Sequence, residues 1–568
     1  MTNPIIDIAP QWLISLADFI QMIGFGKGGR RWYAVVILLI AYWIWNIFQK
    51  RQNIRSDNWF IGSVLIGVFL LKSPDLLLLS IDSDEGEWIS GAATLVHDYR
   101  FWYAVDGTTS GPLTIVPLAL IHYVGASINY ATVRLFGLLI YVLPSLYFVF
   151  RATKTLINND LAKFVTIPIA LAWILVTTPI YNSEYPILLL LSLLVYCYAK
   201  YSNIPRLRWL LIGGIVAGLM PFAKPQVGPL GIIWGGIFLW VVNRPKISIK
   251  SSLWLCLAGI LPTLFIAFYL TITGIWDDFL TSYIYKNLKF GTDKQFTFID
   301  LTTSVFEYFR LVPENRYWLN LTQLFVLVFI VLKLVQFKSK HLFGVSQKHT
   351  WVAFIGLLAA VFCVIKPFTF SYHYQTILYV PTAFFSACFL FEWRKTFFED
   401  TDSFEKTIKI SLLSYLITMP LLFTAQALSG ISGLPKIEGS RRPAKSELGK
   451  VVSNYTQPNE QMASWGICTG LYVETGLLRG TRDGHTAWQM SPGPFQNYLI
   501  QRFVTDMKRN KPKVFVETFT GLAFWGYSEG RPKYGIEQYP ALYNHIKAHY
   551  QLVADLDEGK SRVYIFKK

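Results

Sequence analysis

Four carboxylates stand close together in the segment SIDSDEGEWISGAATL (residues 80–95), which comes directly after a strongly apolar stretch. They are Asp82, Asp84, Glu85 and Glu87. A carboxylate that is held in place can act as a general base and take the proton of a hydroxyl nucleophile. Ionisable groups at the end of an apolar segment are functional candidates. For Asp82 and Glu87, however, we expect the alternative, a solvated acidic loop.

Asp84 and Glu85 differ from the other two carboxylates because they stand at the start of a helical pattern. The continuation WISGAATLVHDYRFW is typical of a helix. The pair would then lie in the first helical turn, where the helix dipole stabilises negative charge. This position predicts a fixed pair of carboxylates, of which one can serve as a base.

Three other turns place ionisable side chains at the ends of apolar runs, in TTPIYNSEYP, MPFAKPQVGP and KPFTFSYHYQ. These turns carry Glu184, Lys224, Lys366, His373 and Tyr374. Each residue alone could be a snorkelling or capping side chain. Together, a carboxylate base and several cations suit a transfer reaction in which a hydroxyl is deprotonated while a phosphate leaves. The same set could also serve an ion pathway.

The composition requires that these turns lie at a membrane. The 568 residues are 53% hydrophobic and only 15% charged, with a mean hydropathy of +0.38, which indicates a polytopic membrane protein. The net charge of +17 does not indicate nucleic acid, because the basic residues form short clusters between apolar runs, as the positive-inside rule expects. Four of the five cysteines lie in apolar runs, so we expect neither disulfides nor a cysteine metal site.

The loops between the apolar runs alternate in charge, and this alternation predicts the topology. Basic loops such as KYSNIPRLR and NRPKISIK should face the cytoplasm, so the turns with the candidate residues should face outward. The run 112–124 is short for a crossing and is predicted to be a juxtamembrane or re-entrant helix on the outer face. About 12 spans are expected, beginning near residues 31, 59, 131, 161, 184, 207, 226, 251, 318, 350, 374 and 410.

The chain divides into three predicted regions. Residues 1–58 are an extension with an interfacial helix and the first span, and residues 59–430 form the transmembrane catalytic domain with an outer loop at 80–130. Residues 431–568 are predicted to form a small soluble α/β domain on the extracytoplasmic side. Its expected strands are MASWGI, KVFVETF and YQLVADLDEGKSRVYIF, and its expected helices are SPGPFQNYLIQRFVTDMKRN and YPALYNHIKAHY.

The order of these motifs resembles a known family. DEGEWISGAATL, VDGTTSGPL and INYATVRLFGLL precede SEYPILLLLSLL, GLMPFAKPQ, SYHYQTILYVP and ASWGICTGLYVETGLLRGTR. This series is similar to the bacterial branch of the dolichyl-phosphate-mannose-protein mannosyltransferase superfamily (families 39 and 83), from about residue 59 onward. The resemblance implies a GT-C fold and an inverting glycosyltransferase in the cell (inner) membrane. Its donor would be a polyisoprenyl-phosphate-linked sugar and its acceptor a hydroxyl of a glycan, lipid or protein on the outer face.

The resemblance also implies roles for individual residues. Asp84 would be the catalytic base, and Glu85 would orient the acceptor or the base. Asp106 and Glu184 would position substrate. The donor phosphate would be held by Lys224, His373, Tyr374 and Arg134. The sequence departs from the family pattern at SGPL, residues 110–113, where the family commonly has two prolines.

Other interpretations of these residues remain open. Asp82 and Asp84 form a D-x-D, a spacing that can hold a divalent ion, but basic side chains alone can assist the departure of a lipid phosphate, and we expect no metal or other cofactor. A transporter or flippase of a lipid-linked saccharide would use similar polar groups near the bilayer midplane, whereas these lie at span ends. A non-catalytic envelope-assembly subunit could keep the same fold.

Overall fold

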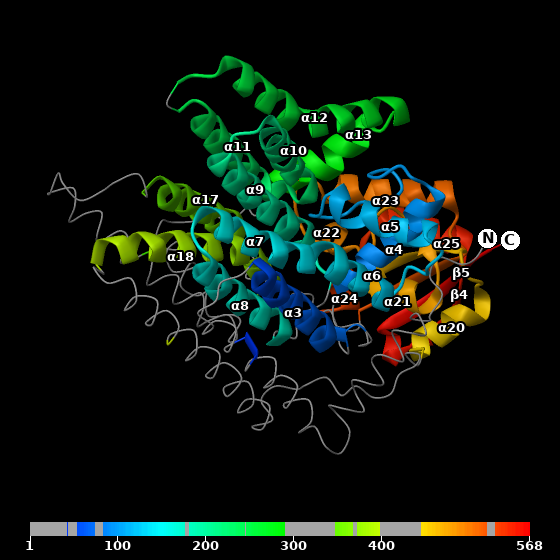
Figure 1. Cartoon of the computed structure of the whole chain (residues 1–568). Coiled ribbons are helices and arrows are strands. Elements are labelled where there is room, and N and C mark those ends of the chain that lie inside the picture. The colour runs from blue at the N-terminus through cyan, green and yellow to red at the C-terminus, as the bar shows by residue number, and fades with distance from the viewer. Residues whose placement is uncertain are drawn as a thin grey trace.

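A computed structural model describes two parts of the chain, a helical bundle and a C-terminal α/β domain (Figure 1). The description covers residues 42–43, 54–73, 76, 83–175, 181–244, 246–289, 326, 347–366, 372–397, 410, 445–519 and 529–567. Asp82, the predicted interfacial helix and the boundary at 430/431 lie outside the described residues. So do nearly all residues of the spans predicted near 31, 318 and 410.

The bundle is built of apolar helices. Within the described residues, six stretches are long and apolar enough to cross a membrane: Tyr130–Leu156, Tyr185–Asn203, Pro225–Val242, Ile249–Thr273, Lys348–Ile365 and His373–Trp393. This confirms the expectation of a polytopic membrane protein, while the number of 12 spans stays a prediction. The bundle helices are α3 (Ile54–Lys72), α6 (Tyr130–Phe136), η2 (Gly137–Val142), α7 (Leu143–Leu156), α8 (Asn159–Leu175), α9 (Tyr185–Asn203), α10 (Leu207–Ala223), η3 (Pro225–Val227), α11 (Gly228–Val242), α12 (Ile249–Thr273), α17 (Gln347–Ile365), η5 (Tyr372–Gln375) and α18 (Thr376–Phe397).

Shorter helices lie where the bundle meets the C-terminal domain. They are α4 (Ser83–His97), α5 (Pro112–Tyr123), α13 (Trp276–Phe279), η4 (Leu280–Tyr285) and α14 (Lys286–Lys289). The run predicted to be too short for a crossing is the helix α5, which has 12 residues where a span needs about 20. It begins with Pro112, whose fixed backbone angle suits the first helical position. In Figure 1, α4 and α5 lie between the bundle and the C-terminal domain.

The C-terminal domain has a five-stranded sheet in the order β2-β1-β3-β5-β4. β1 pairs in parallel with β2 and β3, and β5 pairs in antiparallel fashion with β3 and β4. The segment predicted as one last strand is a hairpin of two, since Asp557, Glu558 and Gly559 have positive φ angles and turn the chain. The elements are α20 (Glu447–Tyr455), β1 (Gln461–Gly466), α21 (Thr469–Thr475), β2 (Leu478–Arg479), α22 (Ala487–Met490), α23 (Gln496–Asn510), β3 (Val514–Thr518), α24 (Arg531–Tyr534), η7 (Ile536–Gln538), α25 (Pro540–His549), β4 (Tyr550–Leu556), η8 (Asp557–Gly559) and β5 (Ser561–Phe566).

Alternation along the strands gives the sheet two apolar faces. On one face Trp465 packs edge-on against Phe503 of α23 and beside Tyr539. On the other face Met462 lies with Tyr472 of α21 in a second cluster. Side chains that alternate along a strand point to opposite faces, so both faces of β1 are covered and the strand is buried.

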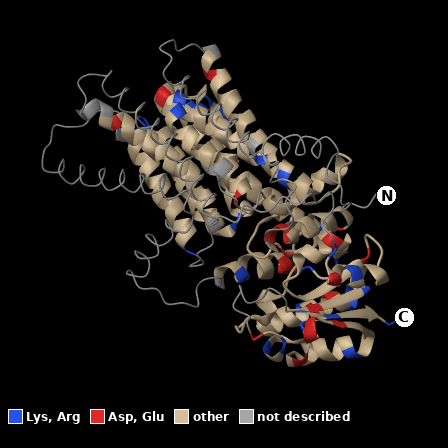
Figure 2. Cartoon of the chain, turned by 90° about the horizontal axis from the view of Figure 1, so that it is seen from below, with Lys and Arg blue, Asp and Glu red and all other residues tan. Residues whose placement is uncertain are grey.

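The C-terminal domain rests directly on α4. The Thr469 hydroxyl donates a hydrogen bond to the Ser83 carbonyl, and Gly86 faces the backbone of Thr469 and Gly470. A Cβ atom at Gly86 would lie 2.7 Å from the Thr469 carbonyl carbon. The glycine of the DEG motif therefore allows two backbones to touch. This contact places the C-terminal domain on the same side of the bundle as Asp84, and the ribbon in Figure 2 is coloured for acidic and basic residues where the two parts meet.

Replacing Gly86 by alanine should weaken this contact. The new methyl group would meet backbone atoms, which cannot rotate away, and overpacking of this kind costs about 1–3 kcal/mol. We expect Gly86→Ala to lower the midpoint of thermal unfolding of the detergent-solubilised protein. The control is Gly236→Ala, since Gly236 is helical and a Cβ there meets nothing within 4 Å. Equal midpoints for the two variants would contradict the close contact.

Candidate active site

The predicted catalytic pair lies in the first turn of α4, as the sequence indicated. Asp84 is half-buried, whereas the Glu85 side chain is completely buried. Asp84 is also within electrostatic reach of the Lys224 ammonium. The charge of Asp84 therefore interacts with that of Lys224, whereas Glu85 is enclosed in the protein interior.

Lys224 belongs to a cluster that the sequence predicted. Its ammonium donates to the Ser183 hydroxyl at 3.1 Å and forms an ion pair with Glu184. It also lies 4.1 Å from the centre of the Tyr374 ring, a distance at which a cation is attracted to the ring face. His373 packs edge-on against Tyr374 and lies within electrostatic reach of Glu184. The start of α9, the end of α10 and η5 thus bring these residues together.

Local sequence explains how Lys224 leaves its helix. Proline disfavours a helical conformation in the residue before it, and Lys224, which precedes Pro225, is extended with φ −157° and ψ 129°. The segment before α5 holds this turn: the Gly111 N–H donates to the Ala223 carbonyl at 2.9 Å. A proline at 111 could not donate this bond, and a Cβ there would meet the Phe222 carbonyl oxygen. The glycine of SGPL, residues 110–113, therefore has a structural reason.

Glu85 and Arg134 form a buried ion pair. Arg134 Nη2 lies 2.6 Å from Glu85 Oε2, and Arg134 Nε donates to Oε1 at 2.9 Å. Both side chains are fully buried, and the Tyr181 N–H also donates to Glu85 at 3.2 Å. In this arrangement the guanidinium of Arg134 faces Glu85. The predicted phosphate-binding role of Arg134 stays a prediction, and the geometry favours a role in holding α4.

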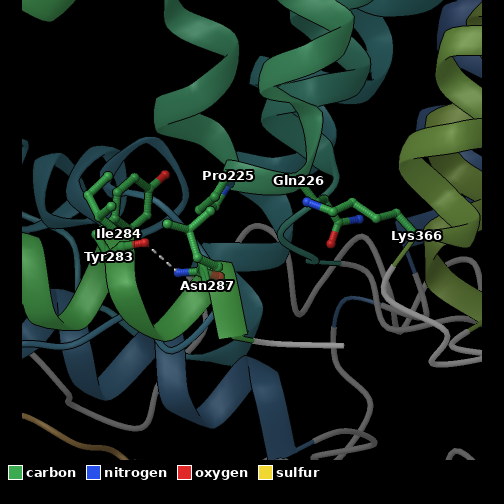
Figure 3. A pocket seen from close by; sticks show the side chains of 7 residues that line it. Pro225, Gln226, Tyr283, Ile284, Asn287 and Lys366 are labelled. Atoms are coloured by element: carbon green, nitrogen blue, oxygen red, sulfur yellow. Dashed lines mark hydrogen bonds between the residues drawn. The ribbon is translucent and has the colours of Figure 1, made fainter. Parts of the chain in front are cut away.

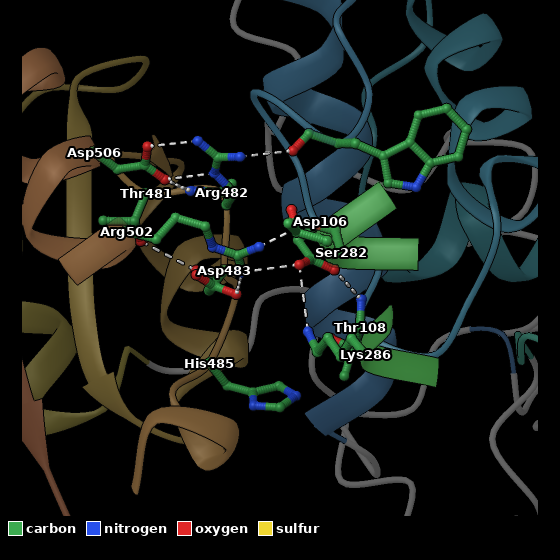
Figure 4. A network of polar contacts seen from close by, with 12 residues as sticks. Asp106, Thr108, Ser282, Lys286, Thr481, Arg482, Asp483, His485, Arg502 and Asp506 are labelled. Atoms are coloured by element: carbon green, nitrogen blue, oxygen red, sulfur yellow. Dashed lines mark hydrogen bonds and ion pairs between the residues drawn. The ribbon is translucent and has the colours of Figure 1, made fainter. Parts of the chain in front are cut away.

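Asp106 lies in a separate network that joins the segment 101–111 to the C-terminal domain (Figure 4). It forms ion pairs with Lys286 at 3.3 Å and with Arg502 at 2.9 Å. Burial opposes ionisation of this carboxyl, but the charges of Lys286 and Arg502 outweigh burial and hold its pKa well below its usual range. Arg502 also pairs with Asp483 at 2.7 Å. Asp106 therefore binds protein cations here, and its predicted contact with substrate stays a prediction.

The expectation of a solvated loop at Glu87 was wrong. Glu87 is 3% exposed and accepts a hydrogen bond from the Thr108 hydroxyl. His485 of the C-terminal domain lies 3.5 Å away. Burial would raise the pKa of Glu87, but His485, Arg479 and Thr108 together lower it. The expectation was wrong because the partners that enclose Glu87 come from distant parts of the chain.

Arg479 is a site residue that sequence reasoning missed. Its buried guanidinium donates to the Glu87 carbonyl, to the Ser90 hydroxyl at 3.0 Å and to the Asp106 carbonyl at 3.4 Å. It therefore joins α4, the segment 101–111 and β2. The available signal was the charged run RGTRDGH in the C-terminal domain. The other residues missed in this network are Arg482, Asp483, His485, Arg502 and Asp506.

A pocket opens beside the Lys224 turn (Figure 3). Its volume is about 130 Å³, and Pro225, Gln226, Tyr283, Asn287 and Lys366 line it. Lys366, one of the predicted cations, thus faces a cavity adjacent to Lys224. Within the described ranges, no group of three or more His, Cys, Asp or Glu side chains could hold a metal ion. Since Asp82 lies outside those ranges, the expectation of a metal-free site stays an expectation.

Comparisons with known proteins give limited relationships. No family model and no curated protein matches the sequence. Among solved structures, the chain is similar to the oligosaccharyltransferase of Archaeoglobus fulgidus in the apo form, with a TM-score of 0.40 and 10% identity, over 87% of this chain and 73% of that chain. The complex of that protein with zinc and sulfate gives a TM-score of 0.39 and 12% identity, over 89% and 73%. The function of this chain is therefore inferred from its own residues.

The ion pair between Glu85 and Arg134 can be tested by a double-mutant cycle. Arg134→Met leaves a buried carboxylate without its cation and should cost about 3–5 kcal/mol of stability. Adding Glu85→Gln should restore part of that loss, as measured by thermal unfolding in detergent. The exposed pair of Lys513 and Glu460 at 2.7 Å is the control, with an expected coupling below about 1 kcal/mol. Additive losses at Glu85 and Arg134 would refute the coupling.

Arg479→Met should loosen the C-terminal domain from α4. The substitution leaves buried oxygen atoms without donors, at a cost of about 1–3 kcal/mol for each such group. The thermal unfolding midpoint should fall well below that of Arg562→Met, which removes partly exposed pairs with Asp555 and Glu537. Arg479→Lys should recover little, because a single ammonium cannot reach the several acceptors of a guanidinium. Full recovery by lysine would show that only the charge matters.

Proposed function

We propose that the protein is an integral-membrane, inverting glycosyltransferase. Its donor is a polyisoprenyl-phosphate-linked sugar, and its acceptor is a hydroxyl group on the extracytoplasmic side. The observation that carries the proposal is the electrostatic interaction of Asp84, at the start of α4, with Lys224 of the cluster at the ends of apolar helices. A carboxylate and a cation near one another at the ends of apolar helices suit a donor whose phosphate is polar and whose tail lies in hydrocarbon.

In the proposed reaction, Asp84 takes the proton of the acceptor hydroxyl. The acceptor oxygen then attacks the anomeric carbon from the side opposite the phosphate, so the configuration of that carbon inverts. The bond between the anomeric carbon and the phosphate oxygen breaks, and the electron pair leaves with the lipid phosphate. Lys224, together with His373 and Lys366, would stabilise the negative charge on that phosphate by charge-assisted hydrogen bonds.

Glu184 is placed to bind the sugar. One of its carboxylate oxygens accepts from Lys224, while the other, Oε2, is buried and has no hydrogen-bond partner among the described residues. A buried acceptor without a donor is costly, and a sugar hydroxyl could supply that donor. Tyr374 would complete this wall of the site, since its ring packs on both Lys224 and His373.

The remaining predicted residues act through Asp84 in this proposal. Glu85 and Arg134 are fully buried against each other, so they are positioning residues that fix the first turn of α4. Asp106 holds the outer loop to the C-terminal domain through Arg502. These assignments separate two functions within the DEG motif, proton transfer at Asp84 and helix placement at Glu85.

The decisive variant is Asp84→Asn, which keeps the shape of the side chain but cannot take a proton. Loss of a general base should slow transfer by about 10²–10⁴-fold, while binding of the donor persists. The assay follows labelled sugar from a panel of polyprenyl-phosphate sugars to envelope acceptors, with purified protein in nanodiscs. The matched control is Asp98→Asn, because Asp98 lies just after the same helix and pairs with Arg100 at 2.6 Å.

The outcomes separate the proposal from its alternatives. Normal transfer by Asp84→Asn would remove Asp84 as the base. If the wild type binds donor but releases no lipid phosphate with any acceptor, a transporter or a non-catalytic subunit becomes the better interpretation. Lipid-translocation assays would then distinguish those two.

A further inference from the structure

A second cluster of charged side chains lies at the other end of the bundle. It contains three cations and three rings from α7, α9 and α10, and we call it the basic-aromatic cluster: Tyr147, Arg151, Tyr196, Lys200, Arg208 and Trp209. Lys200 lies 16 residues after Glu184, and Arg208 lies 16 residues before Lys224. At 1.5 Å per helical residue, each interval is about 24 Å. The cluster is therefore separated from the candidate active site by most of a membrane thickness.

Each helix contributes one cation and one ring to this cluster. The Arg151 guanidinium lies 5.8 Å from the Tyr147 ring centre, and the Lys200 ammonium lies 5.4 Å from the Tyr196 ring centre. Both pairs have the i,i+4 spacing that places side chains one above the other on a helix. The Arg208 guanidinium lies 4.6 Å from the ring of Trp209. All three distances are within the range of cation–π attraction.

The rings connect the three helices. Phe148 packs on Tyr196 with ring centres 5.2 Å apart, and Tyr196 packs edge-on against Trp209 at 5.6 Å. Phe148 also contacts Tyr147 at 5.6 Å. This continuous series of rings limits how far the cations can move apart, since each cation lies over a ring of the series.

The three cations have no carboxylate partner among the described residues. Arg151 and Arg208 instead lie within electrostatic reach of Lys200. The contrast with neighbouring lysines is clear, because Lys154 and Lys163 both pair with Asp57. Like charges held together without an anion repel one another, and a bound anion would remove that repulsion.

We propose that the basic-aromatic cluster binds the phosphate of an anionic phospholipid headgroup. Three cations on separate helices lie over one linked series of rings, and basic pockets between membrane helices are known to hold acidic headgroups. Aromatic rings favour the boundary between hydrocarbon and water, where headgroups lie. Tyr147, at 37% exposure, presents its ring to the surroundings of the bundle. If these cations served only to set the orientation of the helices in the membrane, the cluster would need its positive charge but not the linked rings.

The experiment uses the full-length protein in a non-ionic detergent. Native mass spectrometry would count bound dioleoylphosphatidylglycerol and, separately, dioleoylphosphatidylcholine as each is added. The wild type should bind the anionic lipid more tightly. Arg151→Gln/Lys200→Gln should lower that affinity on the order of tenfold. The matched control, Lys246→Gln/Lys250→Gln, removes the same charge from exposed positions around the start of α12, at the same end of the bundle, and should change it less than about twofold.

Three results would overturn the proposal. They are an equal loss in the control pair, a wild type that does not prefer the anionic lipid, and displacement of the lipid by millimolar inorganic phosphate. The charge-conserving pair Arg151→Lys/Lys200→Arg should keep the preference for the anionic lipid. If the glutamine pair fails to fold, this charge-conserving variant becomes the test. Loss of the preference for the anionic lipid in the folded charge-conserving variant would also contradict the proposal.

Discussion

Burial of two carboxylates within one helical turn is the constraint on which this site depends. An ionised carboxylate inside a protein is stable only with cations or hydrogen-bond donors around it. Glu85 has Arg134 from α6, and Glu87 has His485 and Thr108. The partners come from opposite sides, so α4 is held between the bundle and the C-terminal domain. Asp84, directly before Glu85 in the same turn, is thereby fixed in direction.

Sequence reasoning succeeded where chemistry and local pattern coincide. Glu184, Lys224, His373 and Tyr374 were expected together because each stands at the end of an apolar run, and helix ends on one side of a bundle lie at one level. Lys224 has an additional local signal, the proline after it. The start of α4 was likewise visible from its acidic first turn.

Sequence reasoning failed where contacts between distant segments determine the surroundings of a side chain. Nothing near Glu87 in the sequence reveals His485 or Arg479, which lie almost 400 residues later. For the same reason the sequence does not reveal the buried protein partners of Arg134 and Asp106. The last hairpin shows a smaller failure, since the turn residues of LDEGK were interpreted as part of one continuous strand. That error could have been avoided, whereas the long-range pairs could not be inferred from one sequence.

The route of the chain has a consequence for biosynthesis. The ribosome makes α4 several hundred residues before β2 and α23, yet Arg479 and Arg502 supply contacts that hold α4 and the segment 101–111. Until those arginines have been made, Asp106 lacks Arg502, and α4 lacks its contacts with the C-terminal domain. The helix that carries Asp84 thus reaches its final position only after the C-terminal domain has folded against it. Chains that lack the C-terminal domain would carry every bundle residue of the site without its final alignment.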